Sequence, residues 1–194
     1  MSIHLSKRAV LAALAVGIAA TLQAAADDDI LSKAVNNPSA AWGIYGSAAK
    51  SEIVKDPAVT GGAALRVTIS PKPEHPWDAG TYANTTKPVR KGDVLLLAFW
   101  ARAEQMPPGS TTVDLSGRIY EAAPPNTGVT PETAFHITKD WKLYYANGTV
   151  TKDYPAGALS CGMLLGSGEQ VVDFGPVFVL DFGPGYDVSK LPTN

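Results

Sequence analysis

The chain has 194 residues and a formal net charge of −2, with 16 lysines and arginines against 18 aspartates and glutamates. Binding to a phosphate backbone or to anionic lipid needs a basic patch, so this balance argues against nucleic acid and a charged membrane surface as partners. The single cysteine, Cys161, excludes an intrachain disulfide, and its apolar setting (LSCGMLL) favours a buried small residue over a catalytic thiol.

Residues 1–26 have the pattern of a secretory signal peptide. A basic pair at positions 7 and 8 precedes an apolar run from Ala9 to Leu22, and three alanines ending at Ala26 supply the small residues for cleavage. We therefore predict cleavage near Ala26, export to the periplasm or the medium, and one mature domain over residues 27–194. Loss of the basic pair leaves 14 basic and 18 acidic residues, a net charge of −4. The apolar run is shorter than the ~20 residues of a membrane span, and none is predicted.

In the remaining sequence, apolar residues almost nowhere recur at the spacing of an α-helix, and only a short helical segment is expected, before Pro38. Many extended runs are separated instead by Gly, Pro, Asn and Asp. Runs rich in β-branched and aromatic residues predict ten strands: Lys50–Val54, Leu65–Ile69, Trp77–Tyr82, Val94–Arg102, Thr112–Tyr120, Thr133–Thr138, Lys142–Val150, Leu159–Leu165, Gln170–Asp173 and Val177–Leu180. The pair Asn147-Gly148 fits either a tight hairpin or a bulge in a long strand. This inventory predicts an all-β fold, a two-sheet antiparallel jelly-roll β-sandwich.

Two of these runs carry the most informative pattern. In an extended strand alternate side chains share a face. In VLLLAFWAR (94–102), one face therefore carries the apolar side chains of Leu95, Leu97, Phe99 and Ala101, and the other carries Trp100 and Arg102. TVDLSGRIY (112–120) repeats the arrangement, with Val113, Leu115 and Ile119 against Asp114, Ser116, Arg118 and Tyr120. We interpret the two runs as neighbouring strands with one core face and one polar aromatic face. An aromatic plane fits the C–H face of a pyranose and fixed polar groups fit its hydroxyl edge, which predicts a sugar site.

The sequence also contains four short motifs: AALRV (63–67), GDVLLLAFWAR (92–102), TKDWKLYY (138–145) and QVVDFGPVFV (170–179). Together they resemble the carbohydrate-binding modules of the CenC type (families 4, 9 and 22), which have a galactose-binding-like jelly roll. The resemblance spans most of residues 40–182. It implies non-catalytic binding of a poly- or oligosaccharide, alongside a glycoside hydrolase that we expect on another chain. It also implies an optional structural calcium, with Asp56, Asp173 and Asp181 as candidate carboxylates; no other cofactor is expected.

We place the centre of the predicted sugar site at Trp100, Arg118 and Tyr120. Its margins are formed by Trp77, Arg102 and Asp114. A single stacking or hydrogen-bond contact is worth only about 1 kcal/mol, so binding is expected in the micromolar to millimolar range. The alternative is structural: both arginines would pair with Asp114 or Glu104 as a ladder across the sheet. Trp141 is expected to pack at a sheet edge.

Two other functions stay open. A jelly-roll polysaccharide lyase needs a Tyr or His base and an Arg beside the uronate, which Tyr120, His136 and Arg118 would supply. A glycosidase needs two carboxylates, and Asp114 and Glu121 are candidates on opposite faces of one strand. The sequence has no G-x-S-x-G motif, zinc-ligand spacing or phosphate loop, so no catalytic or metal-binding residues are predicted. The third function is an envelope domain that docks a protein, which would show an apolar patch without a trough.

Overall fold

The computed structural model describes residues 30–194, and the predicted signal peptide lies outside them. Residues 34–194 form one compact unit. Its ten strands are β1 (Gly43–Tyr45), β2 (Ala49–Lys55), β3 (Ala63–Ile69), β4 (Gly80–Asn84), β5 (Asp93–Gln105), β6 (Val113–Glu121), β7 (Thr133–Ile137), β8 (Lys142–Thr149), β9 (Leu159–Leu164) and β10 (Gln170–Pro184), with 3₁₀ turns η1 (Pro76–Asp78) and η2 (Val188–Lys190). No helix in the described part of the chain is both long and apolar enough to cross a membrane.

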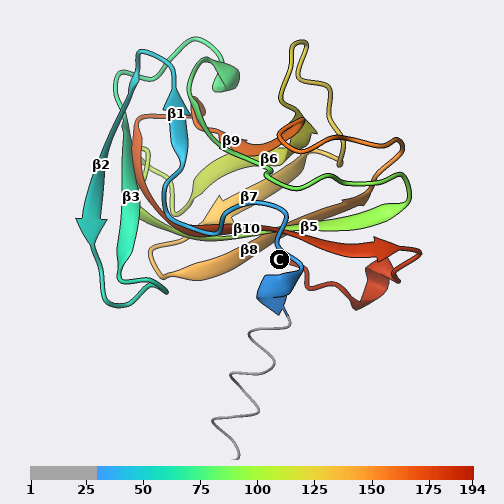
Figure 1. Ribbon diagram of the computed structural model, residues 1–194. Coiled ribbons are helices and arrows are strands. Elements are labelled where there is room, and N and C mark those ends of the chain that lie inside the picture. Colours follow the sequence, from blue (N-terminus) through green and yellow to red (C-terminus); the bar gives the residue numbers. More distant parts are fainter. Residues whose placement is uncertain (1–29) are drawn as a thin grey trace, which may run out of the picture. The chain divides into compact units, whose positions relative to one another are not determined.

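The strands form two antiparallel sheets that pack face to face (Figure 1). Sheet I has the order β1-β4-β9-β6-β7 and sheet II the order β2-β3-β10-β5-β8. The connections join strands of different sheets as well as neighbours in one sheet, as in a jelly roll. The predicted all-β, two-sheet sandwich is confirmed.

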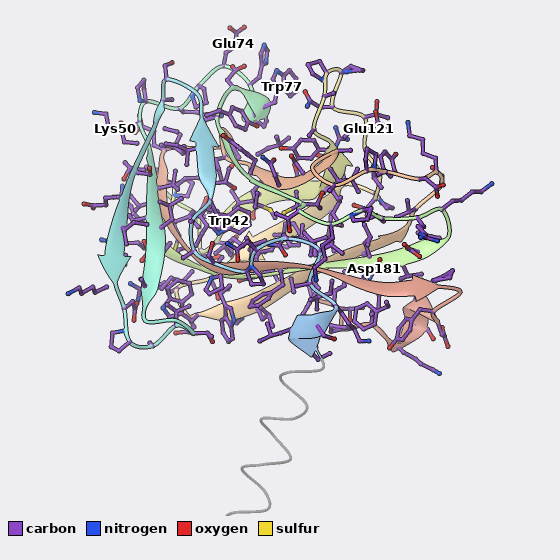
Figure 2. All side chains as sticks on the ribbon, viewed as in Figure 1. Trp42, Lys50, Glu74, Trp77, Glu121 and Asp181 are labelled. Atoms are coloured by element: carbon purple, nitrogen blue, oxygen red, sulfur yellow. The ribbon has the colours of Figure 1, made fainter. Side chains whose placement is uncertain are left out.

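The core lies between the sheets and follows the predicted alternation. Leu95, Leu97 and Phe99 of β5 are fully buried, as are Val113 and Ile119 of β6. Trp42, in the segment before β1, enters the same core, and its indole N–H donates to the carbonyl of Gly175 at 2.9 Å. Figure 2 shows this indole between the two layers. The predicted apolar faces of β5 and β6 are therefore inner faces. The opposite face of β6 is polar, whereas that of β5 carries Trp100 and Arg102 only toward its end; Val94 and Leu96 on it are buried in a second, smaller hydrophobic cluster.

One part of the pairing prediction is wrong. β5 lies in sheet II and β6 in sheet I, so the two strands are not neighbours and their outer faces are on opposite sides of the sandwich. Residues 106–112 cross from one sheet to the other between them. The alternation of apolar and polar residues predicts which face of a strand is buried, but it does not predict which sheet the strand belongs to.

The observed strands differ from the predicted ones at several points. Trp77 and Asp78 of the predicted strand Trp77–Tyr82 lie in the 3₁₀ turn η1, and the strand itself, β4, spans Gly80–Asn84. The two predicted strands after residue 170 are one strand, β10, whose register shifts between Phe174 and Val177. Gly175 belongs to this bulge, where a Cβ would lie 2.6 Å from Val59 and 2.8 Å from the Cβ of Trp100. Asn147-Gly148 stays inside β8, paired regularly with β5, and forms no hairpin. β1 was not predicted, because three residues are too few to show alternation.

Candidate functional site

The outer face of sheet I begins with two matching tripeptides, Gly43-Ile44-Tyr45 in β1 and Gly80-Thr81-Tyr82 in β4. The antiparallel register sets Gly43 opposite Tyr82 and Tyr45 opposite Gly80. A Cβ on either glycine would overlap the ring of the opposite tyrosine, so each tyrosine ring packs directly over the glycine of the neighbouring strand. The pair forms a flat aromatic floor at this end of the sheet, with both rings more than one-third exposed.

Arg118 and Tyr120 extend the floor across the middle of sheet I. In β6 they face Gly162 and Ser160 of β9, and a Cβ on Gly162 would lie only 3.2 Å from the Tyr120 hydroxyl. Tyr120 therefore leans over the glycine. Burial, followed by the influence of Tyr45, Cys161 and Tyr82, raises the pKa of Tyr120 to about 12. The phenol is thus protonated at neutral pH and can donate or accept a hydrogen bond.

Part of this floor, but not Tyr82, lines a cleft of about 700 Å³. Tyr45, Trp77, Arg118, Tyr120 and Glu132 supply its aromatic and charged side chains, and Pro125 and Asn126 border it from the loop after β6. This loop and η1 project from the same side of the molecule (Figure 1). The cleft is therefore a trough with the sheet as its floor and two loops beside it.

Trp77 stands on η1 at the rim of the cleft, and its side chain is 60% exposed. Its ring stacks on His75 with centroids 4.7 Å apart and planes 19° apart. The Asp78 carboxylate accepts the His75 backbone N–H at 2.8 Å, which closes the turn that carries the indole. Figure 2 shows Trp77 projecting outward beyond the strands. An exposed indole held on a closed turn is a ready stacking surface.

The polar groups of the cleft are only loosely bonded within the protein. Arg118 donates to Glu132 at 3.5 Å and to the Asn126 carbonyl at 3.4 Å, both long for a charged pair. Within residues 30–194, the hydroxyls of Tyr45, Tyr82 and Tyr120 make no hydrogen bond. Aromatic planes suit the C–H face of a pyranose ring, and the neighbouring hydrogen-bond donors and acceptors that lack a strong partner suit its hydroxyl groups.

Trp100 and Arg102 do not belong to this cleft, because they lie on the outer face of sheet II. Arg102 donates to Asp173 at 3.0 Å and forms ion pairs with Asp56 and Glu104 at 3.2 Å. Its guanidinium also lies over the Trp141 ring, 5.2 Å from the centroid. The structural alternative is thus correct for Arg102, and the predicted single face joining Trp100 to Arg118 is wrong.

Asp114 lies on the cleft side of sheet I but outside the cleft. Its carboxylate meets His136 Nδ1 at 2.8 Å, and this hydrogen bond lowers the pKa of Asp114. Four residues of strand separate Asp114 from Arg118, about 13 Å, so His136 is too far away to act beside that guanidinium. Glu121 is about 23 Å from Asp114 along β6, well beyond the 5–9.5 Å that a glycosidase pair needs.

The candidate calcium carboxylates do not fit a cation site. Both oxygens of Asp173 accept from guanidinium groups, and Asp56 accepts from the Trp141 indole and the Ala58 amide. Asp181 accepts the backbone N–H of Gly183 at 2.7 Å. Within residues 30–194, no group of three or more acidic, histidine or cysteine side chains is arranged to hold a metal ion.

Sequence reasoning missed Tyr45, Tyr82 and Glu132 as cleft or floor residues. The repeated G-x-Y pattern of β1 and β4 was the available signal, because antiparallel pairing of two such tripeptides sets each tyrosine opposite a glycine. Glu132 precedes β7, and its place beside Arg118 depends on the pairing of β7 with β6. Trp77, Arg118 and Tyr120 were predicted and do line the cleft.

Several solved structures share this fold. A CBM4 structure superposes with a TM-score of 0.51 at 17% identity, over 72% of this chain and 86% of that one. The CBM22-1 xylan-binding domain from Paenibacillus barcinonensis Xyn10C gives 0.53 at 14%, over 74% and 87%. Arabinose-bound MgGH51 α-L-arabinofuranosidase gives 0.55 at 14%, over 77% of this chain and 25% of that one. No family model and no curated protein matches the chain. The resemblance to carbohydrate-binding modules is confirmed as a shared fold.

The raised pKa of Tyr120 predicts a loss of stability in alkali. The pKa of Tyr120 is about 12 in the folded state and near 10 in the unfolded state. Its contribution to the free energy of unfolding is therefore fully present below pH 10 and is lost as the pH rises toward 12. Tyr120→Phe removes this phenol, so the variant should lose less stability than the wild type between pH 10 and 12. Urea unfolding over that range measures the difference, and parallel curves would contradict the assignment.

Proposed function

We propose that this chain is an exported, non-catalytic carbohydrate-binding module that holds a poly- or oligosaccharide in the cleft over sheet I. The observation that carries the proposal is the combination in one trough of Tyr45, Tyr120 and Trp77 with the loosely bonded pair Arg118 and Glu132. Stacking surfaces and free hydrogen-bonding groups are the two things that a sugar ring requires. Association with a separate glycoside hydrolase, and export by residues 1–26, are parts of the same proposal.

The shape of the cleft favours a sugar over a protein partner. A protein-docking surface would offer a contiguous apolar patch, whereas the exposed aromatic side chains here line a trough and alternate with polar groups. The named fold neighbours support the same conclusion, since one of them is described as a xylan-binding domain. Catalysis finds less support. Asp114, Glu121 and His136 lie outside the cleft lining. Tyr120 and Arg118 do line it, but the raised pKa of Tyr120, about 12, keeps the phenol protonated at neutral pH rather than ready to act as a base.

Affinity electrophoresis against plant and bacterial polysaccharides tests the proposal. Wild-type protein should be retarded by at least one polymer, and Tyr45→Ala or Trp77→Ala should each weaken binding about five- to tenfold through loss of one stacking plane. Trp100→Ala is the matched control, because it removes an indole from the opposite sheet and should leave retardation unchanged.

Two results would count against the proposal. Equal loss of retardation in Trp100→Ala and Trp77→Ala would place the site elsewhere, and no retardation by any polymer would remove the function. Incubation with uronate polymers, followed by the absorbance of unsaturated products, separates binding from lyase activity. Steady growth of that signal would show an enzyme.

A further inference from the structure

The arginines of this fold differ sharply in how well their donors are used. Arg66 donates to Asp173 at 2.7 and 2.9 Å, and Arg102 donates to the same carboxylate twice at 3.0 Å. Arg118 has no contact of that quality, because its two bonds are 3.4 and 3.5 Å long and charged hydrogen bonds are normally about 2.7–2.9 Å. Its guanidinium can donate five hydrogen bonds, so most of its hydrogen-bonding capacity is unsatisfied.

Arg118 is nevertheless held in one place. It projects from the middle of β6, between β9 and β7, and its side chain runs against the backbone of Gly128. A Cβ on Gly128 would lie 3.2 Å from Nη1 and 3.4 Å from Cδ of the arginine. The loop after β6 thus packs along one flank of the side chain while the guanidinium opens into the cleft. A guanidinium that is held in position but has unsatisfied donors is suited to bind a hydrogen-bond acceptor of a ligand.

The surroundings select the kind of acceptor. Among the residues that line the cleft, Arg118 is the one cation and Glu132 the one carboxylate; the others are aromatic, apolar or neutral. A sugar hydroxyl would use a single donor of the guanidinium fork, whereas a carboxylate can use two at once and neutralise the charge. Glu132 is nearly half exposed and 3.5 Å away, so it can turn into solvent when a ligand carboxylate takes its place.

We infer that the cleft selects saccharides that carry a carboxylate, with the uronate group on Arg118 and its ring against the neighbouring aromatic side chains. This inference rests on the proposed function, and it adds a charged substrate class to it. Glu132 then competes with the ligand carboxylate for the guanidinium of Arg118. Removing its charge should strengthen binding, which distinguishes this role from that of an ordinary cleft residue.

Matched pairs of polymers test the inference. Glucuronoxylan and polygalacturonate are each compared with their carboxyl-reduced forms, which keep the backbone and lose the charge. Wild-type protein should bind at least one acidic polymer about tenfold more tightly than its reduced form, and added salt should shrink the difference. Arg118→Gln should abolish the preference, Arg118→Lys should keep part of it, and Glu132→Gln should raise affinity for the acidic form severalfold. Arg90→Gln, in an exposed turn, is the control with the same change of net charge.

The outcomes separate the two proposals. Equal binding of the acidic and reduced polymers by the wild type would overturn the uronate inference and leave the sugar-binding proposal standing. Equal losses for both forms in Arg118→Gln, or weaker acidic binding in Glu132→Gln, would also overturn it. Failure of every polymer to bind the wild type would overturn both proposals. Circular dichroism of each variant excludes loss of folding, and the Glu132→Gln result decides the matter if Arg118→Gln does not fold.

Discussion

Asp173→Asn should destabilise the fold by about 3 kcal/mol, the lower end of the range for breaking a buried ion pair. Asp173 is fully buried in β10, and its two oxygens accept four hydrogen bonds from Arg66 and Arg102. The asparagine keeps the shape of the side chain but leaves two guanidinium groups facing a neutral amide. Both arginine side chains are about one-quarter exposed, which moderates the cost.

Glu104→Gln is the matched control for this prediction. Glu104 belongs to the same cluster and pairs with Arg66 at 3.0 Å and Arg102 at 3.2 Å, but its side chain is 43% exposed. Exposed pairs contribute about 1 kcal/mol or less, so this change should be nearly silent. Urea unfolding of both variants measures the difference. Similar midpoints would show that burial of Asp173 does not matter to the cluster.

The cluster also shows where sequence reasoning stops. Asp173 stands between Arg66 and Arg102 because β10 lies between β3 and β5, with all three residues in register. The sequence suggested a ladder for Arg102, whereas Asp173 was considered only as a candidate carboxylate for the optional calcium that the family resemblance implies, because the strand order that joins the residues was unknown. The hydrogen bond to Asp173 is also the main cause of the raised pKa of Arg66. This pairing depends on contacts between distant segments, which periodicity cannot reveal.

The fold was more predictable than the site for the same reason. Burial forces alternation on each strand separately, so the inward residues of β5 and β6 could be assigned from local pattern. The site depends on which strands are neighbours. Arg118 and Tyr120 were recognised because they share a strand face, whereas Tyr45 needed the pairing of β1 with β4. Trp100 was assigned to the site because two strands adjacent in sequence were taken as adjacent in space.

Phe99→Ala should be the most damaging single change in the core, at about 3–5 kcal/mol. Phe99 is fully buried at the centre of an aromatic cluster that joins both sheets. Its ring packs edge-on against Phe135 of sheet I at 5.0 Å and Trp42 at 6.0 Å, and it stacks on Tyr144 of sheet II at 5.7 Å. Truncation would remove all of these contacts and leave a cavity between the sheets that rigid strands cannot close.

Trp100→Ala changes the next residue and removes a larger side chain, yet it should cost less than half as much. The indole lies on the outer face of sheet II and is only partly buried, so water can replace it without forming an enclosed void. Chemical denaturation of the two variants therefore measures the alternation of β5 directly. Equal destabilisation would mean that both faces of this strand are packed alike. The larger loss in Phe99→Ala is expected because Phe99, unlike Trp100, packs in the core against rings of both sheets.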